Sequence, residues 1–207
     1  MFEFYFGRIN MDFIQNIDFS ILFWIQDNIR CAFLDVVMPF ITRLCDDGEI
    51  WILFGIVLLF FKKYRRFGVF VLVAMLLGSI IGNEILKPII ARPRPCHLLS
   101  MLPEMLIDIP KITSYSFPSG HTTSSVIAAT VLMRANKKFG FVAVPLAFLI
   151  AFSRMYLFVH FPTDIIGGTV LGVLIGFFSV TFGNKIWDFV ARKIKERKEQ
   201  KTGNDEN

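Results

Sequence analysis

Long apolar segments separated by short polar ones run through most of this chain. Residues 67–86, 139–159 and 165–183 each contain at most one charged residue. Each is long enough to cross a bilayer as a helix, which takes about 20 residues. Two shorter apolar segments, 50–61 and 120–133, complete the pattern. The sequence therefore predicts a polytopic, all-α bundle with five clear membrane spans, and interfacial Trp and Lys side chains would extend the shorter spans.

The N-terminal part of the chain is apolar but interrupted by charges. Within residues 17–45, apolar side chains recur at helical spacing at Leu34, Val37, Met38, Ile41 and Leu44. We expect residues 1–48 to form helices that either lie at the membrane interface or make an imperfect sixth span. The first residues lack the basic region, apolar stretch and cleavage site of a removable signal peptide.

Glycines four residues apart occur in two of the predicted spans. They are Gly78 and Gly82 in one span, and Gly168, Gly172 and Gly176 in the other. Small residues at this spacing let membrane helices approach closely, so we expect these faces to be helix contacts.

Basic residues gather in three clusters, at 62–66, 134–138 and 185–198. These clusters follow the first, third and fifth predicted spans, so an alternating path puts all of them on one side of the membrane. Lys and Arg mark cytoplasmic loops, which predicts that this side and the C-terminus are cytoplasmic. The expected regions are an arm (1–48), a membrane-embedded core (49–183) and a basic cytoplasmic tail (184–207) that prolongs the last helix along the inner surface.

The composition supports an integral membrane protein. Of the 207 residues, 54% are hydrophobic and 19% are charged, whereas a soluble domain is about 45–50% apolar and about 25% charged. The cytoplasmic clusters account for the net charge of +5 without a nucleic-acid partner. The three cysteines include no Cys-x-x-Cys pair, so they predict neither a zinc site nor a disulfide framework.

Polar residues of unusual kinds gather on the opposite, outer side. They lie in three segments: 87–95 (KPIIARPRP), 118–121 (PSGH) and 153–164 (SRMYLFVHFPTD). Two of the three histidines of the chain are among them. Because the charge pattern puts all three segments near one membrane face, we expect them to form a single site.

The cations and the start of a span in this set suit a phosphate group. Lys87, Arg94 and Arg154 would lie near one surface, and a guanidinium binds two phosphate oxygens at once. Ser119 and Gly120 begin a span directly after a proline. Free backbone N–H groups at a helix start bind anions, and glycine permits close approach.

The histidines add nucleophile and proton-transfer chemistry. His160 precedes Asp164 by four residues, so the carboxylate can hold one imidazole nitrogen and leave the other free to attack. His121 is then a candidate to give and take the proton of the leaving group.

Simpler explanations exist for single members of the set. Lys87 and Arg94 are also typical of residues that flank a span at the headgroups, and Ser119 and Asp164 are also typical N-caps. Arg154 lies inside a span, where charges usually serve a function. Taken together on one face, these residues favour a functional site.

Two nearby groups of charges are less informative. The acidic cluster Asp46, Asp47 and Glu49 favours a solvated turn over a divalent-ion site. Arg92, beside Arg94, suggests contact with a headgroup or the substrate.

The three segments resemble, complete and in order, the motifs of the type 2 phosphatidic acid phosphatase superfamily, the lipid phosphate phosphatases. The first is Lys, six residues, Arg-Pro; the second is Pro-Ser-Gly-His; the third is Ser-Arg, five residues, His, three residues, Asp. They fall at Lys87 to Arg94-Pro95, at 118–121, and at Ser153-Arg154, His160 and Asp164. The resemblance extends over about residues 45–180 and leaves the arm poorly covered.

This resemblance implies a role for each motif residue. His160 would be the nucleophile that forms a phosphohistidine, Asp164 would orient it, and His121 would be the general acid. The phosphate-binding set would be Lys87, Arg94, Ser119, Gly120 and Arg154. The family implies a reaction without metal or cofactor, a helical bundle shared with vanadium haloperoxidases, and a site at the outer membrane face.

The substrate and the function class are less narrowly set. The short chain resembles bacterial undecaprenyl-diphosphate phosphatases, which favours that lipid, but phosphatidylglycerol-phosphate and phosphatidate phosphatases share the motifs.

An anion transporter would need paired, interrupted spans in two related halves, and the sequence shows no such repeat. A non-catalytic scaffold would not need both histidines and Asp164. The sequence leaves the oligomeric state open.

Overall fold

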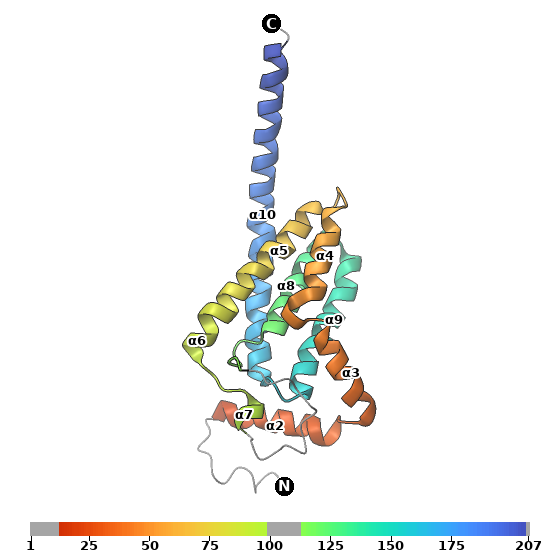
Figure 1. Ribbon diagram of the computed structural model, residues 1–207, viewed down its shortest axis with the longest axis vertical. Helices are drawn as coiled ribbons and strands as arrows, with labels where there is room; N and C mark the ends of the chain where they lie inside the picture. Colours follow the sequence, from red (N-terminus) through yellow and green to blue (C-terminus); the bar gives the residue numbers. More distant parts are fainter. Residues whose placement is uncertain (1–12, 99–112, 206–207) are drawn as a thin grey trace.

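The computed structural model describes residues 13–98 and 113–205, and the described residues form helices and turns without a strand. Figure 1 shows the helices in chain order. They are α2 (Phe13–Asn28), α3 (Ala32–Arg43), the 3-10 turn η1 (Asp46–Gly48), α4 (Glu49–Leu59), α5 (Arg65–Ser79), the π-helix η2 (Ile80–Leu86), α6 (Lys87–Ile90), α7 (Pro95–Leu98), α8 (Gly120–Ala135), α9 (Lys137–Tyr156) and α10 (Pro162–Asp205). The predicted all-α class is confirmed.

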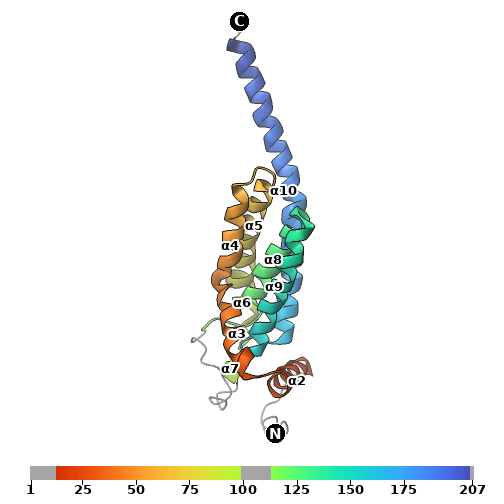
Figure 2. The same ribbon diagram turned by 90° about the vertical axis from the view of Figure 1, so that its right-hand side faces the viewer.

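Helices α4, α5, α8, α9 and α10 lie side by side as a bundle (Figures 1 and 2). Helix α8 packs against α5, α9 and α10 and forms the centre. Three segments of the described chain are long and apolar enough to cross a membrane: Arg65–Leu98, Lys137–Tyr156 and Pro162–Arg197. Helix α4 is apolar but shorter, and α8 has 16 residues. Each apolar segment predicted from the sequence thus has most of its residues in one bundle helix, although segment 67–86 runs on from α5 through η2.

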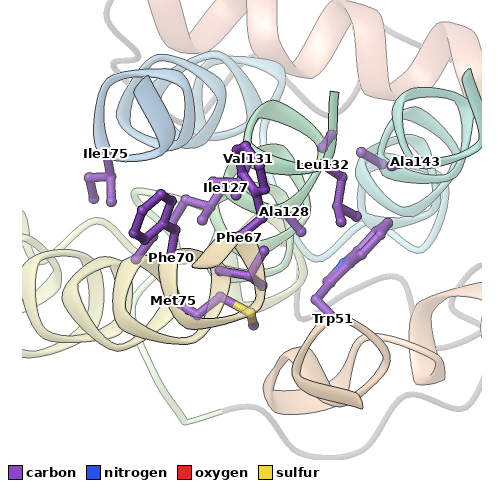
Figure 3. Close-up of a cluster of buried hydrophobic side chains, with 14 of the residues drawn as sticks. Trp51, Phe67, Phe70, Met75, Ile127, Ala128, Val131, Leu132, Ala143 and Ile175 are labelled. Carbon is purple, nitrogen blue, oxygen red and sulfur yellow. The ribbon is translucent and has the colours of Figure 1, made fainter. Parts of the chain in front are cut away.

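The core of the bundle lies around α8, between α4, α5, α9 and α10, as Figure 3 shows. Trp51, Phe70 and Ile127 are almost fully buried there, and the indole N–H of Trp51 donates to Ser125 Oγ at 2.9 Å. Many other large apolar side chains, such as Phe141, are exposed on the outside of the bundle. An apolar exterior is what helices facing lipid require.

The basic clusters and the motif segments occupy opposite ends of the bundle. The α4–α5 and α8–α9 turns, which carry two basic clusters, lie at the end from which α10 extends (Figure 1). Helices α6 and α7, the start of α8 and the α9–α10 turn lie at the other end. This separation agrees with the arrangement predicted from the charge pattern.

Helix α2 crosses the motif end of the bundle at a steep angle to the bundle helices (Figure 1). Its buried side chains include Phe19, Leu22 and Phe23, whereas Phe13 and Trp24 are exposed. The arm is therefore amphipathic and covers the end where the motifs meet.

At the opposite end, α10 continues without a break beyond the bundle (Figures 1 and 2). The expected helical tail is present, but it extends along the line of α10 and does not turn along a surface. Nothing in its sequence breaks a helix between residues 184 and 200, and the ion pairs Lys193–Glu196 and Lys195–Glu199 join neighbouring turns.

The close contact between α8 and α10 depends on glycine. A Cβ atom on Gly168 would lie 2.8 Å from the carbonyl oxygen of Ser119, and one on Gly172 would lie 2.9 Å from that of Thr123. Both distances are too short for a real side chain. The contact predicted from the glycine spacing is confirmed on α10, and it holds the Ser119 turn against the start of that helix.

We predict that Gly172→Ala destabilises the protein, because the added methyl group meets the α8 backbone. Overpacking of this kind costs about 1–3 kcal/mol. Gly82→Ala is the matched control, because its Cβ would meet only Leu171 and Pro118 at 3.8 and 3.9 Å. Thermal unfolding in detergent measures both variants, and a Gly172→Ala protein that unfolds no earlier than wild type would contradict the close packing.

Candidate active site

A cavity of about 790 Å³ lies between the three motif segments and the apolar interior of the bundle. Its polar wall includes six of the residues predicted for the site: Lys87, Arg94, Gly120, His121, Arg154 and His160. Its apolar wall includes Ile52, Leu72, Met75 and Leu76. The other two predicted site residues, Ser119 and Asp164, are fully buried and adjoin this wall through hydrogen bonds described below. The structure therefore brings all the predicted site residues together.

His160 lies in the turn between α9 and α10 and is 1% exposed. Its Nδ1 is 3.4 Å from Asp164 Oδ2, and its Nε2 is 3.0 Å from Arg94 Nη1. A proton on Nδ1, facing the carboxylate, leaves the electron pair on Nε2. Burial, with the charges of Arg94, Arg154 and Lys87, lowers the pKa of His160 well below 6.5. The imidazole is therefore neutral at pH 7, as a nucleophile requires.

Two non-glycine residues with left-handed backbone conformation lie beside the site. Ala91 (φ 48°) ends α6 just before Arg92, and Phe158 (φ 59°) follows α9 just before His160. Such conformations cost about 1–3 kcal/mol and persist where packing enforces them. Phe158 is buried, and its ring lies 5.6 Å from that of Phe23 on α2. The arm thus helps to hold the turn that carries His160.

Arg94 is held by neutral acceptors. Its Nε donates to Ser114 O at 2.8 Å, Nη1 donates to Val159 O at 2.9 Å, and Nη2 donates to Ser114 Oγ at 3.0 Å and Tyr115 O at 3.2 Å. No carboxylate within the described chain pairs with this guanidinium. Its position is fixed while its charge stays available to an anion.

The other two predicted cations approach the cavity from different helices. Arg154, in the last turn of α9, is 6% exposed and donates through Nη1 to Thr42 Oγ1 on α3. Its Nε is buried and has no hydrogen-bond partner within the described chain, so an anion in the cavity could accept from it. Lys87 directly follows η2, and its Nζ lies 3.8 Å from where a Cβ on Gly120 would be. The absence of a side chain on Gly120 keeps the space beside this ammonium open.

Ser119 caps α8. Its Oγ accepts the N–H of Thr122 at 3.4 Å and the hydroxyl of Thr122 at 3.0 Å, and its own N–H donates to the carbonyl of Asp164 at 3.2 Å. Asp164 likewise has a structural task, because its Oδ2 accepts the N–H of Phe161 at 2.8 Å while facing His160. The N-cap explanation therefore holds for Ser119. It is wrong for Asp164, which lies inside the first turn of α10 and accepts the N–H of the residue before the helix.

His121, in the first turn of α8, also has a carboxylate partner. Its Nε2 is 3.2 Å from Oδ1 of Asp46, which is 57% exposed in η1. The expectation that Asp46 belongs to a solvated turn did not include this contact, because nothing in the sequence pattern links Asp46 to a histidine 75 residues later. No group of three His, Cys, Asp or Glu side chains within the described chain is placed to hold a metal ion.

Arg92 bridges two carboxylates, contrary to the expectation of a contact with a headgroup or the substrate. Its Nη1 donates to Asp164 Oδ1 and its Nη2 to Asp18 Oδ2, both at 2.6 Å. Asp18 belongs to α2 and is fully buried. The sequence pattern did not single out Asp18. One signal was available: Asp18 lies next to Phe19 on the apolar face of the arm, and an acidic residue on such a face needs a buried partner.

The model of the PAP2 superfamily matches residues 67–188 of this chain. The chain is 34% identical over 168 residues to an undecaprenyl-diphosphatase of Sulfolobus acidocaldarius, covering 80% of this chain and 79% of the relative. It is 30% identical over 159 residues to an undecaprenyl-diphosphatase of Bacillus subtilis, and this match covers 76% of this chain and 79% of the relative.

Among solved structures, the chain is similar to the transmembrane PAP2-type phosphatidylglycerolphosphate phosphatase of Bacillus subtilis. The TM-score is 0.67 and the sequence identity is 28%, and the match covers 89% of this chain and 94% of that one. The helical arrangement of this chain is therefore that of a PAP2 membrane phosphatase.

We predict that Arg94→Lys weakens binding of inorganic phosphate by roughly tenfold or more, because a lysine keeps the charge but loses the planar fork. Arg134→Lys, at the opposite end of α8, is the control and should bind like wild type. Isothermal titration calorimetry of phosphate into the detergent-solubilised protein measures both. Equal affinity in Arg94→Lys and wild type would contradict the assignment of Arg94 to the anion site.

Proposed function

The chain belongs to the PAP2 superfamily and is a membrane lipid phosphatase, and we propose that it removes the terminal phosphate of undecaprenyl diphosphate through a phosphohistidine on His160. The observation that carries this proposal is the convergence of a His–Asp pair and three cations on one cavity whose other wall is apolar. A phosphorylated lipid has both matching parts, an anionic headgroup and a hydrocarbon tail. No finding supports the alternative of an anion transporter.

In the first step, Nε2 of His160 attacks the terminal phosphorus. The N–P bond forms as the bond from phosphorus to the bridging oxygen breaks, and undecaprenyl phosphate leaves with that oxygen. His121 gives its proton to the leaving oxygen. The imidazole becomes cationic because Nδ1 keeps its proton, and the Asp164 carboxylate, 3.4 Å away, stabilises that charge.

In the second step, water attacks the phosphohistidine. His121 takes a proton from the water, the N–P bond breaks, and its electron pair returns to Nε2 of His160. Inorganic phosphate is released. In both steps Arg94, Arg154 and Lys87 would neutralise the negative charge on the phosphoryl oxygens, aided by the backbone N–H groups at Ser119 and Gly120.

The same cations prepare the nucleophile before substrate arrives. They lie close enough to lower the pKa of His160, together with burial, so the imidazole has its electron pair when the phosphate enters. Arg94 lies 3.0 Å from that nitrogen and would shift its contact to a phosphoryl oxygen on binding. Phosphate thus replaces the imidazole as the partner of the guanidinium.

Relatives support the choice of lipid only in part. The two relatives described above are named undecaprenyl-diphosphatases, whereas the solved structure acts on phosphatidylglycerolphosphate. We favour undecaprenyl diphosphate because the Sulfolobus acidocaldarius relative, which carries that name, is 34% identical to this chain, whereas the phosphatidylglycerolphosphate phosphatase is 28% identical. Phosphatidylglycerol phosphate is the competing substrate.

We further propose that the motif end faces the outside of the cell and the basic end faces the cytoplasm. The support is the gathering of the Lys and Arg clusters at the end from which α10 extends. An outward-facing site would act on lipid phosphates in the outer leaflet.

We expect the purified protein in detergent to release phosphate from undecaprenyl diphosphate faster than from phosphatidylglycerol phosphate, with EDTA present throughout. His160→Ala should lose at least about a thousandfold in kcat, since a nucleophile cannot be replaced by its neighbours. His97→Ala is the matched histidine control and should retain activity. Faster release from phosphatidylglycerol phosphate would reassign the substrate, and full activity of His160→Ala would refute the phosphohistidine.

We expect a cysteine at Asn28 to react with a membrane-impermeant maleimide in intact cells, and a cysteine at Glu199 to react only after permeabilisation. Both positions are exposed, at the two ends of the molecule. The parent carries Cys31→Ser, because native Cys31 is exposed, and its own labelling gives the background. The reverse pattern of labelling would invert the proposed orientation.

A further inference from the structure

We propose that Asp18, on the arm helix α2, is a positioning residue for catalysis that acts on His160 through Arg92 and Asp164. The inference rests on the proposed function, because it takes His160 as the nucleophile. It adds a residue from outside the three motif segments, on a helix that the superfamily match at 67–188 does not include.

The carboxylate of Asp164 divides its contacts between its two oxygens. Oδ2 faces His160 Nδ1 at 3.4 Å and accepts the Phe161 N–H at 2.8 Å. Oδ1 accepts from Arg92 Nη1 at 2.6 Å. The plane of the carboxylate, and with it the direction of its contact to the imidazole, is therefore set by Arg92 on one side and the backbone on the other.

Arg92 in turn is fixed from three directions. Its Nη1 also donates to Thr163 Oγ1 at 2.7 Å, and its Nη2 donates to Asp18 Oδ2 at 2.6 Å. Its guanidinium lies 4.0 Å from the ring centroid of Phe161. A guanidinium can bridge two carboxylates in this way because its N–H groups form a rigid planar fork.

Asp18 is fully buried although α2 lies at the periphery of the bundle. Its Oδ1 accepts the Thr163 N–H at 3.0 Å, and its Oδ2 accepts the Thr163 hydroxyl as well as Arg92. A buried carboxylate is stable only when paired and hydrogen-bonded. These contacts supply the pairing and attach the arm to the first turn of α10, beside Asp164.

The bridge has an electrostatic consequence for His160. If Arg92 paired with Asp164 alone, its positive charge would cancel that carboxylate in a site shielded from water. Asp18 shares the guanidinium, so the group of two carboxylates and one guanidinium retains a net charge of −1. Asp164 can then stabilise the imidazolium that forms when His160 attacks phosphorus. Loss of the Asp18 charge should weaken the transition state more than the substrate complex.

The test is Asp18→Asn in the full-length protein, assayed with the substrate that wild type hydrolyses. We expect kcat to fall about tenfold with KM changed less than about twofold, the scale typical of groups that orient an active residue. Orthovanadate mimics the transition state, because its vanadium binds a histidine nitrogen as a fifth ligand. Its inhibition constant should rise about tenfold in this variant. Inhibition by inorganic phosphate, which mimics the bound ground state, should be unchanged.

Two variants separate positioning from anchoring of the arm. Asp27→Asn removes an exposed carboxylate from the same helix and should behave as wild type. Asp18→Glu restores the charge and should recover kcat to within about threefold of wild type. If Asp18→Asn matches wild type in kcat, or weakens vanadate and phosphate inhibition equally, Asp18 only anchors α2 and the proposal is wrong.

The remaining outcomes are also decisive. If Asp18→Asn does not fold, the Asp18→Glu variant decides. Activity and vanadate inhibition close to wild type in that variant support the role of the Asp18 charge. A folded Asp18→Glu protein that vanadate no longer inhibits overturns it. A wild-type protein that hydrolyses no lipid phosphate would instead refute the proposed function. An active wild type with an unchanged Asp18→Asn refutes this inference alone.

Discussion

The site depends on burying positive charge without neutralising it. Arg94 is 3% exposed, and its partners are carbonyl and hydroxyl oxygens and the neutral imidazole of His160. These acceptors replace the lost water contacts of the guanidinium but leave its net charge intact, which is costly unless an anion is bound. Two residues earlier in the chain, Arg92 is matched by two carboxylates. One short Arg-Pro-Arg-Pro tract thus supplies a cation for the ligand and a cation for the structure.

The helical architecture explains how these charges are held in place. Glycines on α10 let α8 approach so closely that the Ser119 turn contacts the backbone of Asp164. Motif segments more than 40 residues apart in sequence therefore share hydrogen bonds directly. Strained turns at Ala91 and Phe158 lie three residues before Arg94 and two residues before His160, and the arm packs against the second of them.

The sequence predicted what depends on local pattern and on chemistry typical of a phosphate site. These patterns predicted the apolar spans and the separation of the basic end from the motif end. They also predicted the grouping around one cavity of Lys87, Arg94, His121, Arg154 and His160. They did not predict the pairs His121–Asp46 and Arg92–Asp18, because each joins residues over 70 positions apart with no shared periodicity. The sequence also ended the predicted span at residue 86, whereas the chain continues from the π-helix into helix α6, which begins at Lys87.

The size of the cavity has a consequence for how such an enzyme meets its lipid. A volume of about 790 Å³ holds a headgroup and the first part of a tail, but not a whole polyprenyl chain. Most of the proposed substrate would stay dissolved in the bilayer during catalysis, so the membrane itself completes the binding site. The search for substrate then takes place in two dimensions. The relevant concentration is the number of lipid phosphates per unit area of membrane, and dilution by inert lipid slows the enzyme as effectively as a competitor would.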